Sequence, residues 1–374
     1  MPPAVAPWAL ELALQHTLVF GNDGRVLKRV AAHRDATDSV QQLACNAPLQ
    51  FFRAQPPVPR LAIYVHGGLN TEADSLLRVR IMAPYFRANG IYPLFITWKT
   101  GVLESVRDII IDHLERLPPA ARPLWDRLRE LAAEAMDRSI EVLAGPIAKP
   151  LWSEMKQNAL AALAPGRGLD LLTLALRQLS VQLPGLQLHL VAHSAGSIVL
   201  GQLLTLFSAQ GLQARSCHLY APACPLRIAL ETYLPAFERG TLAAANTHLH
   251  LLSDMRERAD SVGLYRKSLL YLVSRALEEH HKTPLLGMEI THSLAPAGIW
   301  HPAEVDGVRQ WQALPPACSP NIHIIDSEKI STGRYGRPMR AAHGNFDNDA
   351  ELLTTTLQDV RGAPLSYPVE WLEY

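Results

Sequence analysis

The sequence has little of several features that mark particular classes of protein. Its 374 residues include only four cysteines, and their spacings fit no Cys-x-x-Cys motif. Such a low cysteine content excludes a disulfide-rich scaffold, and we expect free thiols in a reducing compartment. No His or Cys spacing in the sequence suggests a metal site, so we expect neither a metal nor a cofactor. The cysteines are Cys45, Cys217, Cys224 and Cys318.

Charge of one sign and long apolar runs are also missing. Lys plus Arg and Asp plus Glu number 35 each, and no basic run is interleaved with aromatic residues, so nucleic acid is not an expected partner. No apolar run approaches the length of a membrane-spanning helix, and residues 1–7 lack the basic and apolar regions of a secretory signal. We therefore expect no integral membrane segment and, by default, a cytoplasmic location. The oligomeric state remains unknown from the sequence.

Hydrophobic residues make up 48% of the sequence, which is enough for a large core. A hairpin is expected where residues 17–20 and 25–30 flank the turn-forming residues 21–24, and it would form the antiparallel edge of a sheet. Helical segments separate a further set of apolar runs, which predicts an α/β fold with a mostly parallel central sheet flanked by helices. The expected strands lie near 61–65, 91–97, 186–191, 216–221, 247–252 and 321–325.

The most informative stretch follows the strand at 186–191. It reads Ala192-His193-Ser194-Ala195-Gly196 and precedes an apolar, helix-like segment, so a strand, a sharp turn and a helix are expected with Ser194 at the apex. A G-x-S-x-G turn of this kind exposes a serine hydroxyl for nucleophilic attack, and it needs small residues on both sides because the backbones approach closely. Alanine replaces the first glycine here and adds only one methyl group.

A second element lies upstream, where the apolar strand 61–65 runs into His66-Gly67-Gly68. Paired glycines after a buried strand allow backbone N–H groups to face a cavity, although an ordinary tight turn has the same composition. In this position Gly68 would form an oxyanion hole with the N–H of Ala195, the residue after the nucleophile. His66 is expected to orient this loop rather than to take part in chemistry.

These motifs together resemble the α/β-hydrolase superfamily of serine esterases and lipases. The resemblance continues at residues 95–98 and in the segment 322–326 followed by His343-Gly344-Asn345-Phe346, and it covers about residues 58–100 and 180–360. It implies a catalytic triad in the order serine, acid, histidine. His343, in a polar loop after the last strand, resembles the family's catalytic histidine and is the expected base among 15 histidines.

The acid is expected to follow a strand next to that of the nucleophile. Asp254 comes directly after the strand 247–252 and has no obvious structural task, so it is the preferred acid. Asp260 is the alternative, although it could instead cap a helix beginning near residue 263. Asp326 is a more distant third, because in the family pattern its strand delivers the histidine loop.

The domain organisation follows from where strands are expected. Residues 1–374 are expected to form a single α/β-hydrolase domain, with an N-terminal hairpin and lead-in and a core on both sides of an inserted segment. The insertion lacks a convincing strand and predicts a helical cap, including a helix from Pro123 to Gly145. Its last helix, near 169–179, should pack on the sheet. The lead-in is 1–57, the core 58–100 and 181–374, and the cap 101–180.

The function implied by these residues is hydrolysis of carboxylic esters through an acyl-enzyme, with a small-molecule ester as the substrate. Ser194 would attack the carbonyl, His343 would take its proton, and the acid would orient His343. The alternatives are an acyltransferase on the same fold and a member of the fold that only binds partners. A lipase that prefers long acyl chains is a variant of the ester hydrolase. The sequence does not reveal the acyl-chain length, the alcohol part or the physiological substrate.

Overall fold

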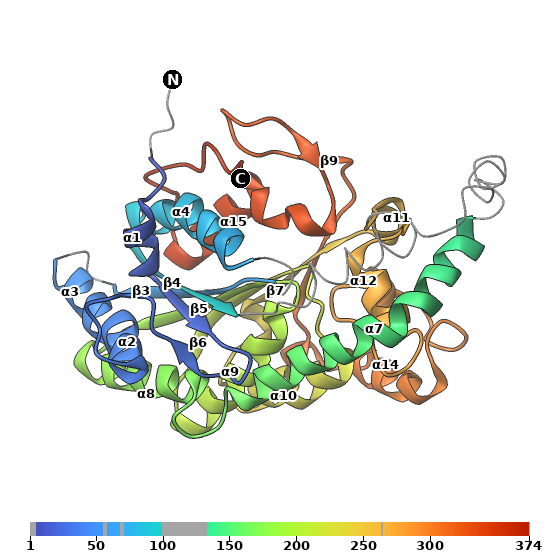
Figure 1. Ribbon diagram of the computed structural model, residues 1–374, viewed down its shortest axis with the longest axis horizontal. Helices are drawn as coiled ribbons and strands as arrows, with labels where there is room; N and C mark the ends of the chain where they lie inside the picture. Colours follow the sequence, from blue (N-terminus) through green and yellow to red (C-terminus); the bar gives the residue numbers. More distant parts are fainter. Residues whose placement is uncertain (1–4, 55–57, 68–70, 99–132, 263–264, 374) are drawn as a thin grey trace.

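The computed structural model places most of the chain, and every structural statement below concerns these residues (Figure 1). The described residues are 5–54, 58–67, 71–98, 133–262 and 265–373.

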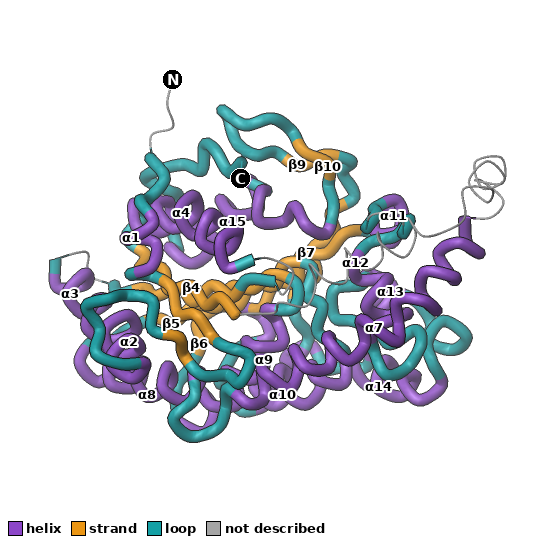
Figure 2. Tube along the Cα trace, in the orientation of Figure 1, coloured by secondary structure: helices purple, strands orange, loops and turns teal. Residues whose placement is uncertain are grey.

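An eight-stranded sheet forms the centre of the molecule, in the spatial order β2-β1-β4-β3-β5-β6-β7-β8. All neighbouring pairs are parallel except β1 with β2. The sheet crosses the middle of the molecule between two layers of helices (Figure 2). Its strands are β1 Thr17–Phe20, β2 Val26–Leu27, β3 Arg60–Val65, β4 Ile91–Trp98, β5 Gln187–His193, β6 Ala214–Tyr220, β7 Thr247–Leu252 and β8 Asn321–Ile325.

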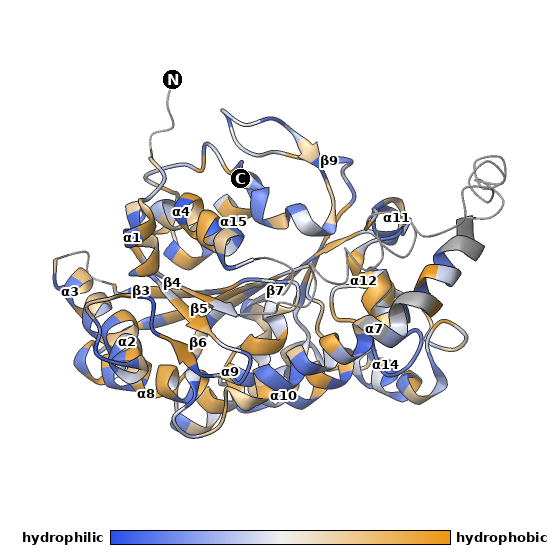
Figure 3. Ribbon diagram, in the orientation of Figure 1, coloured by the Kyte–Doolittle hydropathy of each residue, from blue (hydrophilic) through white to orange (hydrophobic). Residues whose placement is uncertain are grey.

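The strand predictions from the sequence are confirmed, including the antiparallel hairpin at the edge, where Val19 pairs with Leu27. The central strands are apolar throughout because helices cover both faces of a parallel sheet, which leaves no face for water. Every residue of β4 is buried, and so is β3 from Leu61 to Val65. Figure 3 shows this band of apolar sequence along the middle of the molecule.

Two groups of helices make the outer layers (Figure 1). On one face, α4 contacts β4 and α15 contacts β3, with α1 beside α4. On the other, α9 packs on β3, β5 and β6 and is flanked by α8 and α10. The helices that bracket the sheet are α1 Leu10–Leu14, α4 Glu72–Ala88, α8 Gly168–Gln182, α9 Gly196–Gln210, α10 Leu226–Glu238 and α15 Ala350–Arg361.

Shorter elements complete the fold. Among them, the ribbon of β9 and β10 separates β8 from a 3₁₀ segment, His343–Asn348, that leads into α15. The remaining elements used below are α2 Ala36–Gln41, α3 Ala47–Arg53, α11 Asp254–Ala259, α12 Leu269–Leu272, α14 Val305–Gln312, β9 Lys329–Ile330 and β10 Met339–Arg340.

The segment expected to form a cap is only partly described. Residues 101–132, with the predicted start of a helix at Pro123, lie outside the described residues. The prediction that this helix ends at Gly145 is wrong, because α7 runs from Ala133 to Ala161 with Pro146 and Pro150 inside it. The later helix is present as α8, which packs on α9 and on the α2–α3 region. Whether the segment acts as a cap stays a prediction.

Buried polar contacts attach α7 to the segment around α12. Lys156 forms a 2.6 Å ion pair with Glu278, which also accepts a hydrogen bond from the indole N–H of Trp152. Nearer the start of the helix, Asp137 pairs with Lys267 at 2.9 Å. These buried contacts join α7 to the residues that follow α11. Loss of either partner would leave a buried charge without its counter-charge.

All four cysteines are free thiols, and three of them are buried. None of the helices in the described parts of the chain is both long enough and apolar enough to cross a membrane.

Candidate functional site

The turn between β5 and α9 holds Ser194 in a strained conformation. Its φ of 52° lies in the left-handed region, which side chains with a Cβ rarely adopt. Two backbone hydrogen bonds to the neighbouring strand end hold this conformation, from Ser194 N–H to the Tyr220 carbonyl at 2.9 Å and from Ala223 N–H to the Ser194 carbonyl at 3.0 Å. Strain of this kind persists only where the surroundings fix it, and it commonly marks a functional position.

Close backbone approach explains the glycines around Ser194. A Cβ added to Gly196 would lie 2.3 Å from the carbonyl oxygen of Val65 and 2.8 Å from that of His66, so no other residue fits there without movement. A Cβ on Gly67 would lie 3.1 Å from Cβ of Ser194. The end of β3 therefore lies directly against the serine turn, as the sequence motifs predict.

The structure brings Ser194 and His343 together across the whole C-terminal half of the chain. Nε2 of His343 lies 2.9 Å from Oγ of Ser194, within hydrogen-bond distance. Both side chains are buried, at 4% and 3% exposure. Burial, together with the nearby His193, holds the pKa of His343 well below its usual value, so the ring is neutral at neutral pH and Nε2 can accept the serine proton.

Of the two candidate acids, Asp260 is the one that reaches His343. Its Oδ2 accepts a 2.9 Å hydrogen bond from the backbone N–H of His343, and its Oδ1 accepts one from Ser261 N–H at 2.8 Å. Asp254, which the sequence favours, instead pairs with Arg258 at 2.7 Å and accepts the hydroxyl hydrogen of Tyr271. The structure thus gives Asp254 a structural task and leaves it away from the histidine.

An incorrect assignment of helix caps explains why the sequence favours Asp254. Asp260 does not cap the next helix, because the side chain of Ser268 begins α12 by accepting from Tyr271 N–H at 3.4 Å. Asp260 instead lies just after α11, where the chain turns towards the histidine segment. The third candidate, Asp326, accepts a 2.6 Å hydrogen bond from the hydroxyl of Ser253.

The second ring nitrogen of His343 has no assigned partner. Nδ1 is buried and has no hydrogen-bond partner among the described residues. Burial lowers the pKa of His343 and the charge of Asp347 opposes that, whereas Asp260 contacts His343 through its backbone N–H. The pKa of Asp260 is raised by burial, and its hydrogen bonds from His343 and Ser261 oppose that rise.

A buried polar network that the sequence did not reveal supports the histidine segment. Nε2 of His193 bonds to the carbonyl of His343 at 2.9 Å, and Nδ1 lies 3.1 Å from Oδ2 of Asp347. Arg78, on α4, forms a 2.6 Å ion pair with that same oxygen, and the Tyr64 hydroxyl donates to the other. The network joins β3, α4, β5 and the 3₁₀ segment beneath the Ser194–His343 pair.

The carboxylate of Asp347 carries the negative charge of this network. Although burial opposes ionisation, His193 and Arg78 lower the pKa of Asp347 far below its usual value, so this carboxylate stays ionised. The sequence places His193 next to Ser194. Its imidazole contacts the 3₁₀ segment that leads into α15, and strand alternation puts it on the same face as His189 and Val191.

The predicted oxyanion hole is only partly described. Gly68 lies outside the described residues, so its predicted role stays a prediction. Ala195 directly precedes α9, where the N–H groups of the first turn have no partner within the helix and the helix dipole is positive. His66 is buried with neither ring nitrogen hydrogen-bonded to a described residue, and burial lowers its pKa to about 3, so the ring is neutral.

Other candidate sites lie apart from Ser194. A cavity of about 930 Å³ lies near the N-terminus among Trp8, Phe51 and Tyr92, and neither Ser194 nor His343 lines it. Among the described residues, one group of side chains has metal-ligand spacing, namely His218, His248 and Asp359. Neither place contains the serine and histidine that the sequence singled out.

Comparisons with known proteins found no match, whether with protein-family models, with curated proteins or with solved structures. The residues and their geometry are therefore the grounds on which a function can be argued.

Proposed function

We propose that this protein is a serine hydrolase of carboxylic esters with an α/β-hydrolase fold, acting on a small-molecule ester. The observation that carries the proposal is the 2.9 Å contact between Oγ of Ser194 and Nε2 of a neutral, buried His343, with the serine held at a φ of 52°. A serine beside a neutral imidazole is the arrangement that makes a hydroxyl nucleophilic at neutral pH.

The reaction would proceed in two stages. As Oγ of Ser194 bonds to the ester carbonyl carbon, its proton passes to Nε2 of His343, and the carbonyl oxygen becomes an oxyanion. The N–H groups of Ala195 and Gly68 are the proposed donors to that oxyanion. The intermediate then expels the alcohol, which takes the proton from His343, and water hydrolyses the acyl-enzyme with His343 again acting as base.

Asp260 is the proposed acid of the triad. A carboxylate that accepts the Nδ1 hydrogen of the histidine fixes its tautomer and stabilises the imidazolium formed on attack. Asp260 already bonds to the backbone of His343, and catalytic hydrogen bonds are often long before substrate binds, so we propose that its carboxylate bonds to Nδ1 in the substrate complex. Asp254 does not fit this role, because Arg258 and Tyr271 occupy its carboxylate.

The experiment is a panel of p-nitrophenyl esters with short to long acyl chains, assayed on the wild type and on Ser194→Ala. We expect the alanine variant to lose turnover at every chain length. A fluorophosphonate probe followed by intact mass should add one label to the wild type and none to the variant. Turnover by Ser194→Ala equal to the wild type would remove the nucleophile from the proposal.

The same panel separates the alternatives. Added alcohol that captures the acyl group in preference to water would indicate an acyltransferase, whereas a wild type with neither turnover nor labelling of Ser194 would indicate a member that binds rather than hydrolyses. Activity that grows with chain length would indicate a lipase. The proposed location is the cytoplasm, which free thiols at Cys217 and Cys224 favour, because a reducing compartment keeps thiols unpaired.

A further inference from the structure

A row of histidines crosses the sheet on the face that α15 covers. His218 on β6 is paired in register with His248 on β7, and His250 on β7 is paired with His323 on β8. Residues paired directly across parallel strands share a face, and alternation puts His248 and His250 on that same face. Their rings stack, with centroids 4.7 Å apart for His218 and His248 and 4.8 Å apart for His250 and His323.

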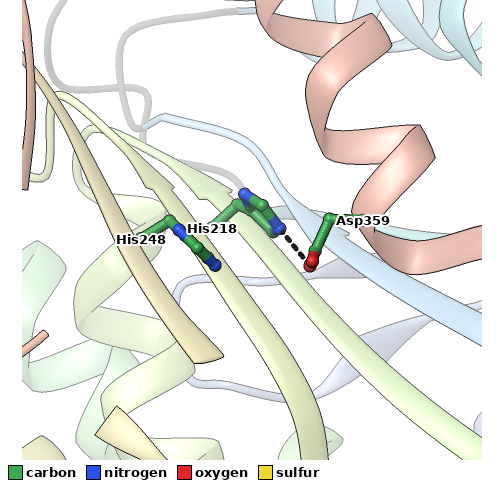
Figure 4. Close-up of side chains that lie close together, drawn as sticks. All are labelled: His218, His248 and Asp359. Atoms are coloured by element: carbon green, nitrogen blue, oxygen red, sulfur yellow. Dashed lines mark hydrogen bonds and ion pairs between the residues drawn. The ribbon is translucent and has the colours of Figure 1, made fainter. Parts of the chain in front are cut away.

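A carboxylate from α15 completes the group. Oδ2 of Asp359 lies 3.0 Å from Nε2 of His218 (Figure 4). One ligand atom from each of His218, His248 and Asp359 lies within 4.8 Å of the other two. The three residues come from β6, β7 and α15, which are far apart in the sequence, so no local spacing of His or Cys could have revealed the group.

The remaining histidines orient the rings for ligation. Nδ1 of His218 lies 3.4 Å from Nε2 of His250, which can accept its hydrogen and leave Nε2 of His218 with a lone pair. Nδ1 of His248 lies 3.0 Å from Nε2 of His323 in the same way. Histidine ligands are usually held by a second hydrogen bond of this kind, which fixes the tautomer.

We propose that His218, His248 and Asp359 bind a divalent first-row transition metal, with Zn²⁺ as the best fit. Two imidazole nitrogens and one carboxylate oxygen suit Zn²⁺, whereas Mg²⁺ and Ca²⁺ prefer sites made of oxygen alone. On binding, Nε2 of His218 and one nitrogen of His248 give lone pairs to the ion, and Asp359 brings the negative charge. The proposal is independent of the proposed hydrolase activity.

The surroundings define what such a metal would do. Asp359 is 42% exposed at its side chain and lines a cavity of about 320 Å³ with His189, Ser216 and Arg215. Three protein ligands beside a cavity leave room for water or a small anionic ligand on the ion. Because α15 directly follows the His343 segment, the ion would also fasten this helix to β6 and β7.

The test uses the full chain without a polyhistidine tag, treated with a chelator and titrated with Zn²⁺ by calorimetry and with Co²⁺ by visible absorption. We expect one ion per chain, Co²⁺ bands of a low-coordinate site, and a higher Tm with Zn²⁺. His248→Ala and Asp359→Ala should each weaken Zn²⁺ binding by about tenfold or more and abolish the Tm shift. Ester hydrolysis need not be measured.

A matched control comes from a second pair of histidines. His280 and His301 stack with centroids 4.3 Å apart, and His280 bonds to Glu304, yet they lie outside the proposed site. His301→Ala should leave Zn²⁺ binding at its wild-type strength. Absence of binding to the wild type, or binding that survives both His248→Ala and Asp359→Ala with circular dichroism unchanged, would overturn the proposal.

Discussion

The backbone N–H of His343 donates a 2.9 Å hydrogen bond to Oδ2 of Asp260. This bond joins the carboxylate to the backbone of the histidine, while Nδ1 of the ring has no hydrogen-bond partner among the described residues. Asp254 is six positions earlier and belongs to another set of contacts, with Arg258 and Tyr271. The two aspartates therefore have separable roles that substitution can distinguish.

We expect Asp260→Asn to lower kcat for an activated ester by at least about a hundredfold with little change in KM, because an amide neither fixes the tautomer nor stabilises imidazolium. Asp254→Asn, the matched control, should keep kcat within about a few fold. The measurement is steady-state kinetics of both variants beside the wild type. Loss of kcat in Asp254→Asn alone would return the acid role to Asp254.

The network beneath the histidine should matter for stability. Asp347→Asn removes the buried carboxylate that pairs with Arg78 at 2.6 Å and His193 at 3.1 Å, and it leaves the positive charge of Arg78 facing a neutral amide. Breaking one side of a buried ion pair typically costs about 3–5 kcal/mol of the free energy of unfolding. Urea unfolding followed by circular dichroism measures this loss.

The control for that substitution is an exposed ion pair. Asp306 and Arg309 are 3.2 Å apart on α14, with side-chain exposures of 94% and 61%. Since water screens such a pair, Asp306→Asn should change the free energy of unfolding by less than about 1 kcal/mol. Equal effects of the two substitutions would contradict a supporting role for the network around Asp347.

The strands of the sheet were predictable from the sequence, because burial on both faces makes them continuous apolar runs. The meeting of Ser194 and His343 was also predictable, since parallel strands bring the segments after their carboxyl ends to one edge of the sheet. The resemblance to a family added the order of the triad residues, which the spacing alone does not give.

The features that the sequence did not predict correctly have identifiable physical causes. Asp254 and Asp260 both lie near the end of β7. The contacts that each side chain makes depend on where α11 ends and on which residue caps α12, and the sequence does not specify either. The helix does not end at Gly145 as predicted. Tertiary packing of α7, through contacts of Trp152 and Lys156, outweighs the local preferences of glycine and proline. The His218, His248 and Asp359 group depends wholly on contacts between distant elements.

Glycine at position 196 should be indispensable. In Gly196→Ala the new methyl group would meet the carbonyl oxygen of Val65 at 2.3 Å, and backbone atoms cannot move aside as a side chain could. We expect a loss of about 1–3 kcal/mol in the free energy of unfolding, as for overpacked positions, and a loss of ester hydrolysis through displacement of Ser194. Thermal unfolding and the ester assay are the two measurements.

Gly344 provides the comparison for that substitution. A Cβ at Gly344 would meet no heavy atom within 4 Å, although the residue follows His343 directly. Gly344→Ala should therefore unfold at nearly the wild-type temperature. If both alanine variants had the same Tm as the wild type, close approach of β3 and α9 could not be the reason for glycine at position 196.

Glu257 should make the protein less stable as the pH rises. Its side chain is 1% exposed, and burial, with Asp260 and Asp254 nearby, raises its pKa from 4.5 to about 8. Between these values the folded chain holds a proton that the unfolded chain has released, so the free energy of unfolding falls as the pH rises from about 4.5 to about 8. Glutamine cannot ionise, so the unfolding free energy of Glu257→Gln should not include the part of this pH dependence that comes from Glu257. At about 1.4 kcal/mol per pKa unit, that part is a few kcal/mol at most. Urea unfolding of both proteins across this pH range measures the difference, and parallel pH dependences would show that Glu257 is ionised in the folded chain.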